Sequence, residues 1–262
     1  MDLLQIYVDA WHDTAVRVIA LCRELQAEDW DEPTDCPGWT VREVVAHLAA
    51  IESELAGGPG PEGVSNERTV SPAYTQPGVE ARSGRTPEQL VDEFEAAVAT
   101  RLAALRDGAL DRPVSAPGRL AWDWDTLLRN RVIDLWVHEQ DIRRAVRRPG
   151  GLDSPGARVT TTAFAMGMPY VLGKRVAPLP GTIVVWEVRD PVAITLAARV
   201  GDDGRAVPVD PPPADADAWL HMDTETFALL CAGRRDAAAV DVSVRGDEAL
   251  AQRVLAAMPL TP

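Results

Sequence analysis

The stretch "RVIDLWVHEQDIRRA", residues 131–145, carries Asp134, His138 and Asp141 at spacings of four and three residues within a run that otherwise has the pattern of a helix. Each residue of an α-helix turns the chain by about 100°. The three side chains therefore project from one side of the helix, within reach of a common point. Such a stripe of carboxylate, imidazole and carboxylate is typical either of one wall of a metal site or of a solvated polar face.

A second predicted helix, "VREVVAHLAAIESEL" at residues 41–55, carries His47 among aliphatic residues. Taken alone, such an imidazole is either a hydrogen-bonded core residue or a ligand. Four-helix bundles build metal sites from side chains on facing helices. Two imidazoles and one carboxylate suit zinc or a similar divalent cation and leave coordination positions open. The sequence therefore predicts a metal site formed by His47, Asp134 and His138.

Other interpretations of these residues stay open at the level of sequence. Asp141 could orient a ligand or act as an acid or base. Alternatively, Asp134 and Asp141 could face solvent and pair with Arg131 or Arg144. A zincin motif is excluded because Ile142 stands where the second histidine of HExxH is required. The chain also contains no GxSxG nucleophile elbow.

Helical periodicity and capping residues predict an all-helical first part of the chain. Thr40 with Glu43 has the pattern of a capping box, and Thr86 followed by Pro87 has that of a helix start. We expect helices near residues 3–26, 40–57, 86–105, 123–148 and 156–172. Residues 57–78, rich in glycine and proline, are expected to form a long loop.

The remainder of the chain has a mixed pattern. The runs "TIVVWEV" (residues 182–188) and "VAITLAARV" (residues 192–200) favour strands, and the Arg-Asp-Pro between them favours a hairpin. A helix near 223–233, a strand near 239–246 and a final helix over 247–258 follow. The fold class is thus α+β, with a helical bundle at residues 1–176 and a smaller α/β domain at residues 177–262.

The composition of the chain excludes some classes of binding partner and indicates the cellular compartment. The formal net charge of −14 argues against nucleic acid and against an anionic membrane surface, since both require a basic footprint. No run of 18 apolar residues occurs, and the start "MDLLQIYVDAWHD" lacks the basic region of a signal peptide. Cys22, Cys36 and Cys231 form no CxxC pair, which favours a reducing cytoplasm. Cys22 and Cys231 are expected in the core and Cys36 in a loop.

The segment "EDWDEPTDCPGWTVREVVAHLAAIE" (residues 28–52), followed by residues 131–145, resembles the mycothiol-dependent maleylpyruvate isomerase family of actinobacteria. That resemblance implies a DinB-like metal-binding four-helix bundle, followed by a C-terminal domain similar to a sterol-carrier-type α/β fold. The pattern of strands followed by "FALLCAGR" is similar to the second domain of that family.

The resemblance also implies roles for individual residues. His47 and His138 match histidine ligands of the metal, and Asp134 stands where the family's isomerase has a glutamate ligand, one methylene longer. Asp141 matches an aspartate used near the metal. Arg234, in "CAGRR", matches an arginine that acts in the site, with Arg235 as the competing candidate.

A thiol has a pKa near 8.5, and a coordinating metal deprotonates it. The resemblance therefore implies a divalent metal, with zinc expected first, and mycothiol as the thiol cofactor. The expected activity is isomerisation or S-transfer on a small electrophilic substrate. Two other functions remain open: a metal-dependent hydrolase on the same bundle, and a metal- or ligand-binding protein without catalysis.

Overall fold

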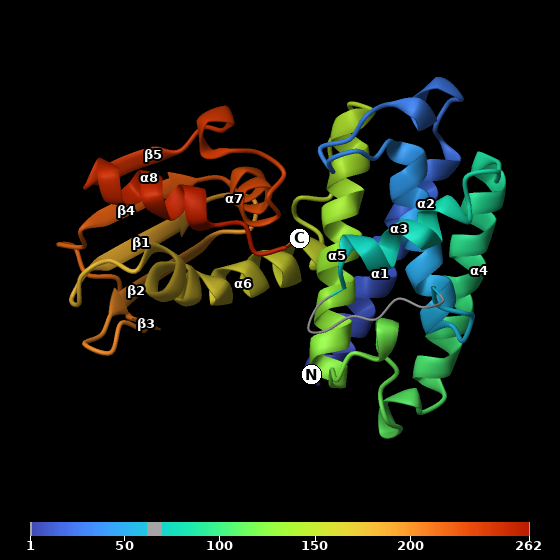
Figure 1. The fold of residues 1–262 in the computed structure, drawn as a ribbon, viewed down its shortest axis with the longest axis horizontal. Helices are drawn as coiled ribbons and strands as arrows, with labels where there is room; N and C mark the ends of the chain where they lie inside the picture. The colour runs from blue at the N-terminus through green and yellow to red at the C-terminus, as the bar shows by residue number, and fades with distance from the viewer. Residues whose placement is uncertain (1, 62–69, 262) are drawn as a thin grey trace. The chain divides into compact units, whose positions relative to one another are not determined.

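The first half of the chain forms a bundle of long helices (Figure 1). The computed structural model describes residues 2–61 and 70–261. The bundle consists of α1 (Leu3–Arg23), α2 (Val41–Leu55), α4 (Pro87–Arg106) and α5 (Trp124–Ala145). Helices α1 and α2 each pack against both α4 and α5. Short 3₁₀ turns at Glu28–Asp31, Ala109–Asp111 and Pro117–Arg119 lie in the connections.

The start of each of these helices is fixed by a local capping residue. Thr40 and Glu43 form the predicted capping box at the start of α2, and Thr86 caps α4 ahead of Pro87. Asp123 accepts a hydrogen bond from the backbone N–H of Thr126 at the start of α5. These interactions satisfy N–H groups that the helix itself cannot pair. The expected helices of the bundle are therefore confirmed.

A short helix, α3 (Pro72–Glu80), occupies part of the predicted loop at residues 57–78, so the loop prediction was wrong there. Two prolines and a glycine lower the helix propensity of this segment, although Pro72 lies in the first turn, where proline is tolerated. Gly78 allows close packing, because a Cβ at that position would lie 2.8 Å from the Cβ of Ala50 on α2. Residues 62–69 of the predicted loop lie outside the described residues.

The second half of the chain is built on a mixed sheet, which in the described residues has five strands in the order β3-β2-β1-β4-β5. The strands are β1 (Ile183–Val188), β2 (Ile194–Val200), β3 (Ala206–Pro208), β4 (Ala218–Met222) and β5 (Ser243–Gly246). The helices are α6 (Pro155–Tyr170), which continues into a π-helical segment at Val171–Val176, α7 (Thr224–Cys231) and α8 (Glu248–Ala257), with a 3₁₀ turn at Ala237–Ala239. The predicted α+β class is confirmed.

Strand β1 lies at the centre of this sheet, and its Val184, Val185 and Trp186 are fully buried. It pairs antiparallel with β2, as the predicted hairpin requires, and parallel with β4. Strand β4, "AWLHM", was not predicted. Its parallel pairing with β1 is non-local, and five residues that include a histidine give a weak strand pattern.

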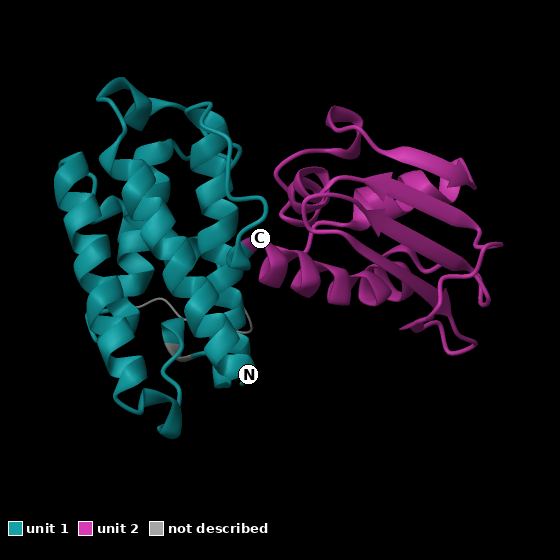
Figure 2. Ribbon diagram, turned by 180° about the vertical axis from the view of Figure 1, so that it is seen from behind, with its two compact units in different colours: residues 1–156 teal, residues 157–262 magenta. Residues whose placement is uncertain are grey.

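The chain divides into two compact units, residues 1–156 and 157–262 (Figure 2). The sequence placed this boundary at 176/177, so α6 and the segment Val171–Val176 are assigned differently. Contacts within the second unit explain the difference. A Cβ at Gly167 of α6 would lie 2.6 Å from Leu260, and Arg253 donates to the backbone oxygen of Val176. Among the described residues, no helix is long and apolar enough to cross a membrane.

One buried carboxylate joins the helices of the bundle. Glu52 on α2 has no exposed surface and accepts hydrogen bonds from Trp11 of α1 at 3.0 Å, Arg101 of α4 at 2.8 Å and Arg131 of α5 at 3.0 Å. The guanidinium of Arg101 also lies over the Trp11 ring, 4.7 Å from its centroid. Burial alone would raise the pKa of Glu52, but the two arginines hold it below its ordinary value. The buried carboxylate is therefore charged and fully partnered.

We expect Glu52→Gln to lower the free energy of unfolding by about 3–5 kcal/mol, because the change removes the buried anion that Arg101 and Arg131 share. Denaturant unfolding at neutral pH measures the loss. The folded-state pKa of Glu52 is depressed, so the wild-type advantage is present above its unfolded pKa of about 4.3 and should be lost as the pH falls below that value.

Glu24→Gln is the matched control, because the Glu24 side chain is 73% exposed and lies 3.7 Å from Arg148. A surface pair of this kind contributes about 0–1 kcal/mol. Equal losses in the two variants would contradict a central role for Glu52.

Candidate metal centre

His47 on α2 and the pair Asp134 and His138 on α5 come together inside the bundle, as the sequence predicted for these three side chains. The Nε2 atom of His47 lies 3.4 and 3.3 Å from the two carboxylate oxygens of Asp134, and Nε2 of His138 lies 3.7 Å from Asp134 Oδ1. One ligand atom from each residue lies within 4.8 Å of the other two. The imidazoles are 3% and 5% exposed, whereas the Asp134 side chain is 30% exposed. The three groups thus form a nearly buried donor set with one accessible member.

The protonation states of this set follow from its surroundings. Burial lowers the pKa of His47, and the nearby Asp134 carboxylate offsets only part of that effect. Burial would raise the pKa of Asp134, but the Arg131 guanidinium, 2.8 Å away, and His47 hold it well below its ordinary value. Near neutral pH, His47 is therefore a neutral imidazole and Asp134 a carboxylate, which are the forms that bind a divalent cation.

Asp141 is fully buried, so the interpretation in which it faces solvent was wrong. Its Oδ2 lies 3.1 Å from Nδ1 of His138, and its Oδ1 accepts a hydrogen bond from Nη2 of Arg144 at 2.7 Å. The predicted pairing with Arg144 and the predicted contact with His138 therefore both exist. When a carboxylate accepts a hydrogen bond from the Nδ1–H of a neutral imidazole, Nε2 carries the lone pair that can bind a metal. For His138, that nitrogen faces Asp134.

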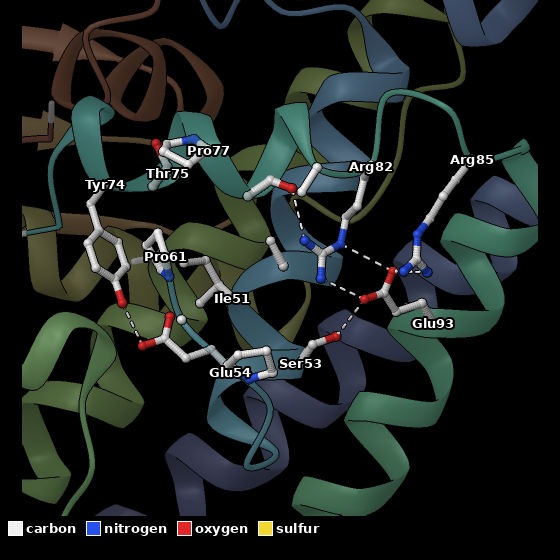
Figure 3. A pocket seen from close by; sticks show the side chains of 15 residues that line it. Ile51, Ser53, Glu54, Pro61, Tyr74, Thr75, Pro77, Arg82, Arg85 and Glu93 are labelled. Carbon is white, nitrogen blue, oxygen red and sulfur yellow. Dashed lines mark hydrogen bonds and ion pairs between the residues drawn. The ribbon is translucent and has the colours of Figure 1, made fainter. Parts of the chain in front are cut away.

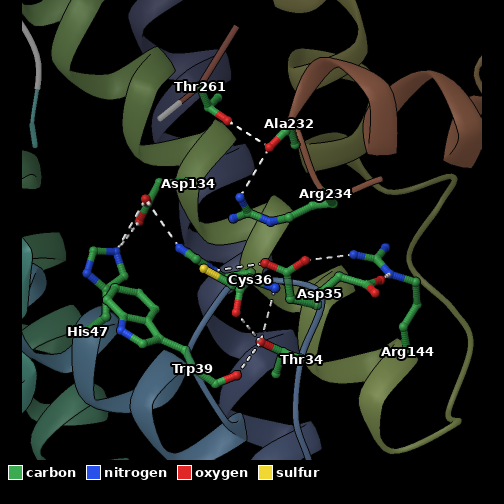
Figure 4. A network of polar contacts seen from close by, with 12 residues as sticks. Thr34, Asp35, Cys36, Trp39, His47, Asp134, Arg144, Ala232, Arg234 and Thr261 are labelled. Atoms are coloured by element: carbon green, nitrogen blue, oxygen red, sulfur yellow. Dashed lines mark hydrogen bonds and ion pairs between the residues drawn. The ribbon is translucent and has the colours of Figure 1, made fainter. Parts of the chain in front are cut away.

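Trp39, for which the sequence predicted no role, lies against both imidazoles, and Figure 4 shows it beside His47. Its ring centroid is 5.1 Å from that of His47 and 6.0 Å from that of His138. The loop before α2 holds it there, since the backbone N–H and the hydroxyl of Thr34 both donate hydrogen bonds to the backbone oxygen of Trp39. Gly38 in this loop has a φ of +81°, which favours glycine. The sequence contained one sign of this contact, because Trp39 directly precedes Thr40, the N-cap of the helix that carries His47.

The same loop is tied to α5 by charge. Arg144 donates through Nε to Asp35 at 2.6 Å while it holds Asp141 with Nη2. Cys36 lies in this loop, as predicted, and its sulfur forms a second group of possible ligands with His138 and Asp141. By contrast, Cys22 and Cys231 are buried core residues, as predicted, and burial raises the pKa of the Cys22 thiol to about 12.

Arg234 belongs to the second unit, where it follows α7 after Ala232 and Gly233 (Figure 4). It is partly buried, and its Nη1 donates to the backbone oxygen of Ala232 at 3.1 Å, whereas Arg235 is exposed. Its part in the site stays a prediction. His221, for which the sequence offered no partner, lies 3.1 Å from Glu187 in the same unit.

Comparison with known proteins assigns the chain to a family. The model of the mycothiol maleylpyruvate isomerase N-terminal domain matches residues 11–143, a span that includes all three ligand candidates. The chain is similar over 92% of both chains, at 16% identity and a TM-score of 0.54, to a crystal structure of the mycothiol-dependent maleylpyruvate isomerase. It is similar to the same extent, with a TM-score of 0.53, to a histidine-to-alanine variant of that enzyme. No curated protein matches the sequence.

At this level of identity, the two solved structures establish likeness of fold and no more. The family match is independent evidence, because it rests on the sequence of half of the chain. The chain belongs to the mycothiol maleylpyruvate isomerase N-terminal domain family.

Proposed function

We propose that this protein is a metal-dependent enzyme that uses a low-molecular-weight thiol, mycothiol, to isomerise or conjugate a small electrophilic substrate. The observation that carries the proposal is the convergence of His47, Asp134 and His138 from two helices, in a chain of a family named for that chemistry.

The donor set fits a tetrahedral zinc ion. Zinc binds imidazole nitrogen at about 2.0–2.1 Å and carboxylate oxygen at about 2.0–2.2 Å, so neighbouring donors are expected about 3.4 Å apart. The observed separations from Asp134 Oδ1 to the two Nε2 atoms are 3.4 Å for His47 and 3.7 Å for His138. This supports aspartate as a ligand where the sequence raised doubt, because the shorter side chain already reaches both imidazoles. A set of three protein ligands also leaves a position for a substrate or thiol.

A bound divalent cation would lower the pKa of a coordinated thiol, which is about 8.5 in the free state, and so supply a thiolate near neutral pH. The residues of the chain would prepare that position. Two neutral imidazoles and one carboxylate leave the site with positive charge when it is loaded, which favours an incoming anion. Trp39 covers the imidazole rings on one side and limits access of water to them.

Two further residues complete the proposed roles. Asp141 lies 3.1 Å from Nδ1 of His138 and is proposed to accept a hydrogen bond from it, which fixes the orientation of the ring. Arg234 is proposed to bind an anionic group of the substrate, since a guanidinium pairs with a carboxylate through two parallel hydrogen bonds. We place Asp141 in a positioning role and keep Arg234 as the candidate for substrate contact.

We expect the purified protein to bind one equivalent of zinc or a similar divalent metal, and His47→Ala and His138→Ala each to lose it. Equilibrium dialysis of metal-free protein followed by elemental analysis measures the stoichiometry. His12→Ala is the control, because His12 lies on α1 outside the donor set. Stoichiometric metal in the His47→Ala, His138→Ala double variant would rule out this site.

Asp141→Asn is expected to weaken zinc binding by about 10- to 100-fold, the range for groups that orient a metal ligand. The amide keeps the size of the side chain but removes the negative charge next to Nδ1 of His138. Competition with a zinc chelator measures the affinity. Asp125→Asn serves as the control, since Asp125 lies on the same helix and pairs with Arg129. Unchanged affinity in Asp141→Asn would show that Asp141 only pairs with Arg144.

Turnover is expected to require the thiol. Isomerisation of maleylpyruvate and conjugation of an aryl halide would be followed with mycothiol present and absent. Arg234→Ala should lower turnover by at least about tenfold, typical of the loss of one charge-stabilising group, with metal content unchanged, while Arg235→Ala should have little effect. Equal wild-type rates with and without mycothiol would exclude the thiol mechanism and favour a metal hydrolase. Absence of any turnover would favour a binding protein.

A further inference from the structure

A cleft of about 400 Å³ lies in the first unit, between α3, α2 and the start of α4 (Figure 3). Tyr74, Thr75 and Pro77 of α3 line one side of it, and Ile51, Ser53 and Glu54 of α2 line the other. Its volume lies in the range of small-molecule sites. Glu54 follows His47 by seven residues on α2, which places it about 10 Å further along the helix axis. No residue that lines the cleft belongs to the candidate metal centre.

One end of the cleft is acidic. Glu54 Oε1 accepts a hydrogen bond from the Tyr74 hydroxyl at 2.6 Å and from the backbone N–H of Gly118 at 3.2 Å. Its other oxygen, Oε2, has no donor among the described residues. Gly60 closes this end, since a Cβ there would lie 2.9 Å from Glu54 Oε1 and 3.0 Å from the Tyr74 hydroxyl oxygen. The carboxylate is thus held in place through Oε1.

The other end is basic, on the opposite side of the cleft in Figure 3. Glu93 accepts hydrogen bonds from Arg82 at 2.6 and 3.1 Å and from Ser53 at 3.0 Å, and it pairs with Arg85 at 2.6 Å. Burial would raise the pKa of Glu93, but the Arg82 hydrogen bonds hold it below its ordinary value. One carboxylate therefore balances two guanidinium groups, which leaves this end with a net charge of +1.

Arg85 is the group at this end that can reach a ligand. Its side chain is 43% exposed, and only its Nη1 is engaged with Glu93. Within the described part of the chain, Nε and Nη2 of Arg85 have no acceptor. Two neighbouring guanidinium N–H groups match the two oxygens of a carboxylate.

The charges of the whole cleft sum to zero, because two glutamates and two arginines line it, yet they are separated between its ends. The wall between them is largely apolar and includes Ala50, Ile51, Pro59, Pro61, Pro77 and Ala81. A ligand with a net charge would leave one end unmatched, and a desolvated charge without a partner is unfavourable. A dipolar molecule with no net charge matches both ends.

We propose that this cleft binds a small zwitterion, with its ammonium group at Glu54 and its carboxylate at Arg85. A dipeptide has the right chemistry, since it carries an ammonium group at one terminus and a carboxylate at the other. Its ammonium group donates to Glu54 Oε2, its carboxylate accepts from Arg85, and an apolar side chain contacts the proline-rich wall. This site is independent of the metal-dependent function and stands if that function fails.

The test uses alanyl-leucine and two capped forms of it as probes for isothermal titration calorimetry with the full chain. N-acetyl-alanyl-leucine lacks the ammonium group, and alanyl-leucine amide lacks the carboxylate. We expect the free dipeptide to bind at least about tenfold more tightly than either capped form, because each capped form leaves one charged end unpaired.

Two variants test which end of the cleft binds the ammonium group and which end binds the carboxylate. Glu54→Gln should abolish the preference for the free dipeptide over its N-acetyl form and keep the preference over its amide. Arg85→Gln should do the reverse, while the Arg82 and Glu93 pair stays intact. Glu80→Gln, an exposed change on α3 outside the cleft, should leave both preferences unchanged. Failure of the free dipeptide to bind saturably, equal binding of the capped forms, or retention of both preferences in the two variants would overturn the proposal.

Discussion

The buried carboxylate of Glu52 is the interaction on which the bundle depends. It receives hydrogen bonds from α1, α4 and α5 while it belongs to α2 itself, so one group joins the helices at their common core. A buried charge is tolerated only when its partners are in place, and removal of one partner costs several kcal/mol. The packing of the helices around Glu52 and the pairing of its charge therefore require each other.

Arg131 connects this structural network to the candidate metal centre. Its guanidinium contacts Glu52 in the core and Asp134 in the donor set, at 2.9 and 2.8 Å. The other carboxylate of the stripe, Asp141, is held in a similar way by Arg144, three residues further along α5. Each carboxylate thus has one arginine and at least one histidine as neighbours. The donor set is consequently positioned before any ligand arrives, which reduces the cost of ordering it on binding.

The two units contribute differently to the proposed function. The first contains the whole donor set and the part of the chain that matches the family. The second contributes a mixed sheet with a fully buried central strand and the partly buried Arg234. Likeness to the solved isomerase spans both units but establishes the fold alone, and a fold hosts many activities. The proposed function therefore rests on the chemistry of the donor set.

Local features of the sequence determined the helices of the bundle and the spacing of the donors along α5. Capping at Thr40, Thr86 and Asp123 acts within one helical turn, and the four residues from Asp134 to His138 form one turn, so neither depends on the rest of the chain. The same local patterns gave the hairpin of β1 and β2. The pairing of His47 with the stripe was an inference from bundle architecture that the packing of α2 against α5 confirmed.

Only the tertiary structure decided the burial of Asp141, the position of Trp39 over the imidazoles, the role of Glu52, and the existence of α3 and β4. Contacts between residues distant in sequence contribute to these features: Asp35 accepts a hydrogen bond from Arg144 across 109 residues, and Trp11 donates one to Glu52 across 41. Whether a polar side chain on a helix faces water or a partner depends on which helix lies opposite. Periodicity gives the face of a helix, and only packing shows what that face meets.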